Sequence, residues 1–75
     1  MQAFMLLVTD SRHDFEVLEF LEGLPQTLEI HRLYGEYDVL VRVRINDPEE
    51  LSSLERELLN GGQILSIDTL IIAGE

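Results

Sequence analysis

Residues 33–38, with the sequence LYGEYD, combine a glycine turn with aromatic residues and a carboxylate. Glycine reaches positive φ without a Cβ clash, so Gly35 predicts a tight turn whose backbone N–H groups stay open to a ligand carboxylate. Asp38 follows at the start of the next strand, where it can meet an ammonium group. A free amino acid carries both an ammonium group and a carboxylate. The same pattern also serves hairpins in which the glycine and the acid only form the turn.

The side chains that metal binding or catalysis requires are not clustered in the sequence. His13 and His31 fall in different predicted elements and lack the i, i+4 spacing of paired metal ligands, so we expect surface positions and no metal. No serine has a Gly-x-Ser-x-Gly setting, and Ser11 is better placed to cap a helix. These observations favour a binding protein without a cofactor over an enzyme.

Composition narrows the class of protein further. The 75 residues include 15 acidic and 5 basic side chains, for a formal charge of −10, and no cysteine. This charge repels phosphates, so we expect no direct contact with nucleic acid. No segment resembles a membrane span or an export signal, which makes the cytoplasm the expected location. A chain this short buries only about 60% of its unfolded surface, and we expect a partner subunit to stabilise it.

The first half of the chain predicts a strand, a helix and a second strand. Residues 3–9 form a continuous apolar run, typical of a central strand that is buried on both faces. Ser11 and Asp14 are placed to cap the following helix, and Gly23 ends it. The apolar stripe of this helix is Val17, Leu18, Leu21 and Leu24. Residues 27–33 read as an edge strand, with Leu28 and Ile30 on one face and Glu29 and His31 on the other.

The second half predicts a strand, a helix and a last strand. Residues 37–45 alternate clearly, with Val39, Val41, Val43 and Ile45 facing inward and Asp38, Leu40, Arg42 and Arg44 facing outward. Asp47 and Pro48 suit the cap and first position of a helix, with Glu50 three residues after the cap. Leu51, Leu54 and Leu58 form its buried stripe, residues 60–62 end it, and residues 64–73 return as a strand.

This βαββαβ order predicts one α+β domain over residues 1–75, with a ferredoxin-like fold: a four-stranded antiparallel sheet with both helices on one face. The other face lacks a cover, and we expect Met5, Leu40 and alternate apolar residues of the last strand to be exposed there. Such a patch favours a homodimer that packs sheet against sheet, as a dimeric α/β barrel. Arg42 and Arg44 on this face can pair with acids of the opposing subunit, or grip a ligand carboxylate or phosphate.

The chain resembles the C-terminal effector domain of the Lrp/AsnC transcriptional regulators, also called the RAM domain. The resemblance lies in VLEFL at 17–21, YGEYDVLVRV at 34–43, DPEEL at 47–51 and ILSIDTLII at 64–72, and spans nearly the whole sequence. It implies amino-acid sensing by a dimer that builds higher rings, and regulation of transcription or metabolism. The effector-binding residues that it implies are Tyr34, Gly35, Glu36, Tyr37, Asp38 and Thr69.

Full-length members of that family carry an N-terminal helix-turn-helix domain for DNA, whereas this sequence begins on the first strand of the effector domain. It therefore resembles a stand-alone form, which would act through an effector, another protein or a full-length paralogue with which it mixes subunits. Two other classes share the element order. An ACT-like amino-acid-binding subunit usually has Pro and Gly in the loop after the first strand, where this chain has neither. A small dimeric α/β-barrel enzyme needs a His or acid between sheet and helices, and His31 is the only candidate.

Overall fold

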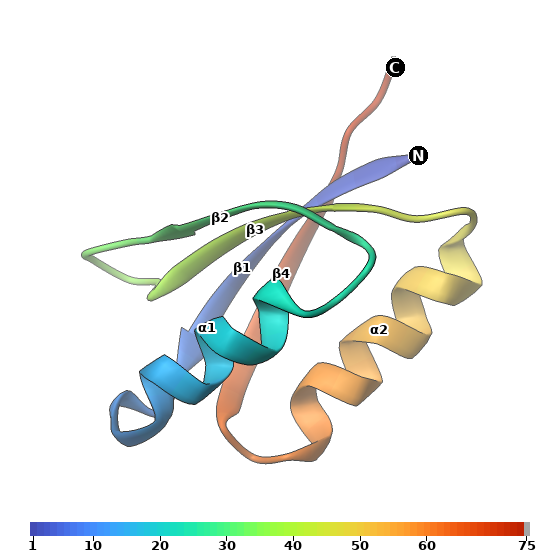
Figure 1. Cartoon of the computed structure of the whole chain (residues 1–75). Coiled ribbons are helices and arrows are strands. Elements are labelled where there is room, and N and C mark those ends of the chain that lie inside the picture. Colours follow the sequence, from blue (N-terminus) through green and yellow to red (C-terminus); the bar gives the residue numbers. More distant parts are fainter. Residues whose placement is uncertain (75) are drawn as a thin grey trace.

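A computed structural model describes residues 1–74 of the chain (Figure 1). The elements are β1 (Gln2–Thr9), a 3₁₀ turn η1 (Ser11–His13), α1 (Asp14–Glu22), β2 (Thr27–Arg32), β3 (Val39–Arg44), α2 (Pro48–Asn60) and β4 (Ile64–Ile71). The strands form one sheet in the order β2-β3-β1-β4, with every neighbouring pair antiparallel. Both helices lie on one side of it (Figure 1). The ferredoxin-like prediction is confirmed, including the central place of β1 and the edge position of β2.

Helix α2 begins and ends at the residues that its sequence indicates. The Asp47 side chain accepts a hydrogen bond from the Glu50 N–H at 2.8 Å, and Pro48 occupies the first turn, where its missing N–H leaves no bond unmade. The Glu50 carboxylate reaches back to the Asn46 N–H at 3.2 Å. After the helix, Gly62 turns the chain with a φ of 76°. None of the helices in residues 1–74 is long and apolar enough to cross a membrane.

Helix α1 starts differently from the prediction, because a 3₁₀ turn precedes it. The capping side chain is Asp10, which accepts from the Arg12 N–H at 3.1 Å, while Ser11, which was expected to cap the helix, lies inside the 3₁₀ turn. Asp14 opens the α-helix and caps nothing; its carboxylate accepts from the Thr9 hydroxyl instead. The 3₁₀ turn occupies the residues that were expected to begin the helix, so the side chain that caps this segment is Asp10 and neither Ser11 nor Asp14. Gly23 ends α1 as predicted.

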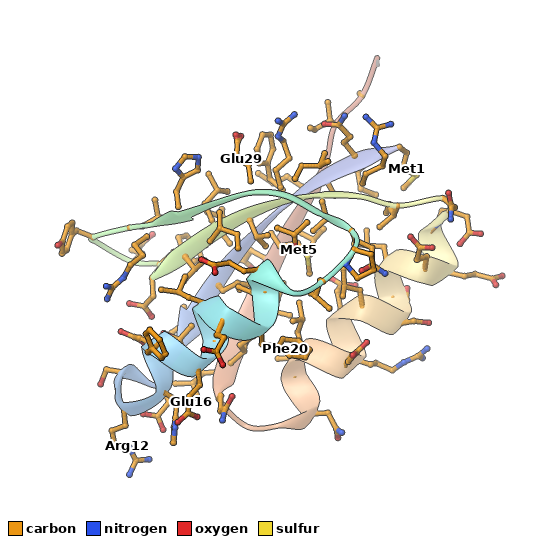
Figure 2. All side chains as sticks on the ribbon, viewed as in Figure 1. Met1, Met5, Arg12, Glu16, Phe20 and Glu29 are labelled. Atoms are coloured by element: carbon orange, nitrogen blue, oxygen red, sulfur yellow. The ribbon has the colours of Figure 1, made fainter. Side chains whose placement is uncertain are left out.

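The core fills the space between the sheet and the helices. Figure 2 shows Met5 in this space and Glu29 projecting from the opposite side of the sheet. The apolar stripe of α2 and the inward valines of β3 are buried as predicted. The fully or nearly buried core residues are Ala3, Met5, Leu7, Val17, Leu21, Val39, Val41, Val43, Ile45, Leu51, Leu54, Leu58 and Ile64.

Two predictions about sheet faces are wrong. Met5 was expected on the uncovered face, but its side chain is 0% exposed and packs under the helices. An uninterrupted apolar run has no alternation to indicate its face, and the partner strands make the assignment. Leu28 was expected to share a face with Ile30. A register shift between Thr27 and Glu29 interrupts the alternation of β2 and leaves Leu28 exposed.

The uncovered face, which we call the outer face, is apolar at its centre and charged toward β2. Leu6 lies opposite Leu40 of β3, and Phe4 lies opposite Leu70 of β4, which is 59% exposed. Arg42 lies opposite Phe4 as well, and its guanidinium pairs within the chain with the Glu29 carboxylate at 3.2 Å. This side of the sheet is therefore only partly buried in the single chain.

The buried position of Met5 predicts a large loss of stability in Met5→Ala. Deleting the side chain leaves a cavity between sheet and helices, and such truncations cost about 2–5 kcal/mol in the free energy of unfolding. Leu59→Ala, at a half-exposed position of α2, should cost far less. Urea unfolding of both variants at one protein concentration measures the difference. Equal losses would place Met5 outside the core.

Candidate functional site

The loop between β2 and β3 forms the turn that the glycine indicates. The Leu33 N–H donates to the Asp38 carbonyl at 2.8 Å and closes the loop, and Gly35 adopts a φ of 128°. This conformation is nearly restricted to glycine. The Asp38 N–H donates to the Leu7 carbonyl at 2.8 Å, which fixes the end of the loop to the central strand. The turn is thus held at a defined place beside β1.

Thr9 brings two carboxylates together at the end of β1. Its backbone N–H donates to Asp38 Oδ2 at 2.8 Å, and its hydroxyl donates to Asp14 Oδ1 at 2.7 Å. Within residues 1–74, Thr9 is the one buried polar residue, at 6% exposure. Buried polar groups need partners, and the N–H and the hydroxyl of Thr9 both donate to carboxylates here. Asp14 therefore joins the neighbourhood of Asp38, a role that its expected function as a helix cap did not suggest.

A pocket of about 190 Å³ opens beside these carboxylates, lined by Asp14, Arg32, Leu33, Tyr34 and Asp38. The Arg32 guanidinium approaches Asp14 Oδ2 at 3.6 Å from the last residue of β2. Drug-sized ligands occupy pockets of about 300–1,000 Å³, so this one suits a small metabolite. The sequence indicated Tyr34 and Asp38. The sequence did not indicate Arg32, because a polar residue at the end of an edge strand usually just faces solvent.

Tyr37 and Glu36 lie in the same loop but do not line the pocket. The Tyr37 hydroxyl donates to the carboxylate of Asp68, which lies opposite Leu6 on the outer face. This hydrogen bond and the negative charge of Asp68 raise the pKa of the Tyr37 phenol. Glu36 is exposed. The roles of both residues in effector binding stay predictions.

Thr69, the remaining predicted contact, lies on the helix side of β4. It stands opposite Met5, and its hydroxyl donates to Glu55 Oε2 of α2 at 2.7 Å. Within the single chain, the structure brings Tyr34 and Asp38 to one pocket, uses Gly35 to shape the turn, and leaves Thr69 apart from them. A role for Thr69 in effector binding therefore stays a prediction that needs a contribution from outside this pocket.

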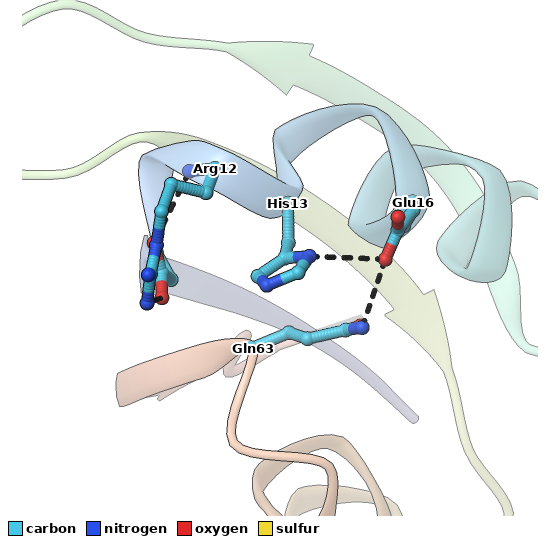
Figure 3. Close-up of polar contacts among 5 residues, drawn as sticks. Arg12, His13, Glu16 and Gln63 are labelled. Carbon is cyan, nitrogen blue, oxygen red and sulfur yellow. Dashed lines mark hydrogen bonds and ion pairs between the residues drawn. The ribbon is translucent and has the colours of Figure 1, made fainter.

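The polar cluster at the start of α1 is satisfied within the chain (Figure 3). The Arg12 side chain donates to both oxygens of Asp10, at 3.1 and 2.7 Å, and these bonds lower the pKa of Asp10 to about 2. His13 Nδ1 lies 3.1 Å from Glu16 Oε2, which also accepts from Gln63 Nε2 at 3.0 Å. The cluster joins α1 to the loop before β4, and its geometry indicates a structural role.

The two histidines lie in separate parts of the structure. His31 stands opposite Leu40 on the outer face, outside the layer between sheet and helices where an enzyme of this fold would need it. His13 lies at the protein surface beside Glu16. Among residues 1–74, no three His, Asp or Glu side chains are grouped so that they could hold a metal ion.

The structure combines a ferredoxin-like sheet with a small charged pocket beside a glycine turn. The family model described as the Lrp/AsnC ligand binding domain matches residues 2–75, so the chain belongs to this family. It is thus a regulatory effector-binding module. No curated protein matches the sequence.

Several solved structures share this fold. A protein from Pyrococcus horikoshii is 32% identical, with a TM-score of 0.85, 99% of this chain covered and 90% of that one. One from Thermus thermophilus is 25% identical, with a TM-score of 0.87 and coverage of 99% and 94%. The transcriptional regulator NMB0573 of Neisseria meningitidis, in complex with L-Met, shares the fold at 23% identity and a TM-score of 0.83, with 99% of this chain matching 50% of the regulator.

The φ of Gly35 predicts that Gly35→Val destabilises the protein. Open space surrounds the position, so the expected cost, about 1–3 kcal/mol, comes from backbone strain alone. Gly61→Val is the matched control, because Gly61 has equally open space and a φ of −80° that any residue can adopt. Chemical denaturation compares the two variants. A Gly35→Val protein no less stable than the control would show that the turn tolerates a side chain.

Proposed function

We propose that this chain is the amino-acid-binding and oligomerisation module of an Lrp/AsnC-type regulator. The observation that carries the proposal is the Asp38 carboxylate, which is held by Thr9 and lines a small pocket beside the Gly35 turn. An ammonium group is the natural partner of such a carboxylate. The L-Met complex of the Neisseria regulator supports the choice of an amino acid as effector.

The module acts through its effector and through protein partners, without contacting DNA itself. Binding to duplex DNA depends on clustered basic side chains that displace counterions, and here a charge of −10 opposes the approach of phosphates. Any effect on transcription then passes through other subunits that do contact DNA.

The effector site is tested with Asp38→Asn. Asparagine keeps an oxygen that can accept from the Thr9 N–H, so the fold should persist, while the charge that receives the ammonium is lost. Losing a charge-assisted hydrogen bond costs about 1.5–3 kcal/mol, a roughly tenfold to hundredfold weaker affinity. A thermal-shift screen of the twenty amino acids identifies the effector, and calorimetry then compares the variant with the wild type.

Two outcomes would contradict this part of the proposal. If no amino acid raises the melting temperature, the effector belongs to another chemical class. If the effector binds Asp38→Asn as tightly as the wild type, this carboxylate only forms the turn.

Assembly is proposed to use the outer face. Phe4, Leu6 and Leu40 form an apolar surface at the centre of the sheet, continued by Leu70 on β4. A second copy packed on this face would remove these side chains from water and form the dimeric α/β barrel. Such dimers are expected to associate further into a ring.

Leu70→Asp tests this face. A charge within the proposed interface should shift the protein from a dimer or larger assembly toward the monomer, as light scattering measures at tens of micromolar. Phe15→Asp is the control, because Phe15 is equally apolar and 76% exposed but lies on α1, on the other side of the sheet. A folded wild-type monomer at this concentration would overturn the proposed interface.

A further inference from the structure

We infer that the cleft between α1 and α2 is a docking site for a basic segment of a partner protein, which inserts one apolar side chain between the two helices. The inference goes beyond the proposed function, because this cleft has no lining residue in common with the pocket at the Gly35 turn and lies on the helix side of the sheet, away from the outer face. A partner bound here leaves the outer face free for a second copy.

The cleft between the helices is apolar and measures about 110 Å³. Three of its lining residues, Val17, Leu58 and Ile64, belong to the buried core, whereas Phe20 keeps 43% of its surface exposed beside them. Figure 2 shows Phe20 between α1 and α2. An apolar cavity of about 150 Å³ accepts a benzene molecule, so this cleft suits a group about the size of a leucine side chain.

Polar contacts hold the elements that surround the cleft. Gln63, which lines it, donates to the Glu16 carboxylate of α1 at 3.0 Å, and the same carboxylate lies 3.1 Å from His13 Nδ1. These contacts tie α1 to the loop that follows α2 (Figure 3). A cleft that is already formed needs little rearrangement to admit a side chain, which lowers the cost of binding.

The helices around the cleft are strongly acidic. Together α1 and α2 carry eight acidic side chains and one basic one, Arg56. Glu57 of α2 lines the cleft, and Glu16 of α1 lies four residues before Phe20, on the same side of the helix. An apolar cleft with an acidic border complements a segment in which basic residues flank an apolar one.

The same charge argues against other occupants. A second copy of the chain would bring its own acidic helices, and the two bases that lie closest in its sequence, Arg42 and Arg44, belong to the outer face of the sheet. Nucleic acids and anionic lipid surfaces are repelled. An uncharged small molecule gains nothing from the acidic border. The occupant that matches both the apolar cleft and its charge is a basic segment of a different protein.

The experiment uses the full chain and synthetic peptides in calorimetry at physiological salt. The peptides are alanine-based, with four arginines around one central anchor, which is leucine, methionine or phenylalanine. At least one of them should bind. Replacing its anchor by alanine should weaken binding about tenfold or more, because the anchor no longer leaves water for the cleft.

Three variants of the protein locate the binding. Gly61 lines the cleft, with open space around it and a φ of −80° that any residue can adopt, so Gly61→Leu fills the cleft in a folded protein. It should weaken the peptide about tenfold or more. Glu57→Lys should weaken it about threefold or more. Glu49→Lys is the matched control, since Glu49 is exposed on the same helix but does not line the cleft, and it should bind as the wild type does.

Several outcomes would overturn the inference. If the peptide with an alanine anchor binds as tightly as its parent, or if both lysine variants weaken binding equally, a basic peptide is only attracted to an acidic protein. Binding to Gly61→Leu at full strength would place the peptide outside the cleft, and a thermal melt checks that this variant is folded. Binding of none of the peptides would also contradict the docking site. The proposed function is tested separately, through Asp38→Asn and Leu70→Asp, and stands or falls without this result.

Discussion

The candidate site depends on one buried residue, Thr9, at the end of the central strand. A buried N–H or hydroxyl without a hydrogen-bond partner is costly. In Thr9 the N–H donates to Asp38 and the hydroxyl donates to Asp14. These two hydrogen bonds join three segments: the end of β1, the start of α1 and the loop before β3. The pocket exists where these segments meet, and its two acids keep their positions because Thr9 holds both. The chemistry of the site thus follows from satisfying a polar residue at the edge of the core.

The two faces of the sheet serve different purposes. The helix side carries the core and, at its end, the pocket; the outer side carries apolar residues that the single chain leaves partly open to water. With only two helices, the chain can cover one face of a four-stranded sheet. The shortage of covering elements, more than any single residue, favours assembly with a second copy, and it leaves the candidate pocket and the proposed interface on opposite sides of β1.

Part of the site was predictable from local sequence. Gly35 and Asp38 are neighbours in the chain, and a glycine turn before an alternating strand indicates where both will lie. Arg32 and Asp14 were not predictable, because they come from different elements and meet only after β2 pairs with β3 and α1 packs on the sheet. The 3₁₀ turn at Ser11 is a related case: it displaces the helix start and turns Asp14 from an expected cap into a partner of Thr9.

Local patterns were enough to identify six elements, the alternation of β3, the cap of α2 and the glycine turn, since each depends on residues within a few positions of one another. The way in which distant strands and helices meet decided the remaining features: the face on which Met5 lies, the exposure of Leu28 and the composition of the pocket. The two faces of an uninterrupted apolar strand cannot be told apart from its sequence. Only pairing with β3 and β4 beneath the helices makes one of these faces part of the core.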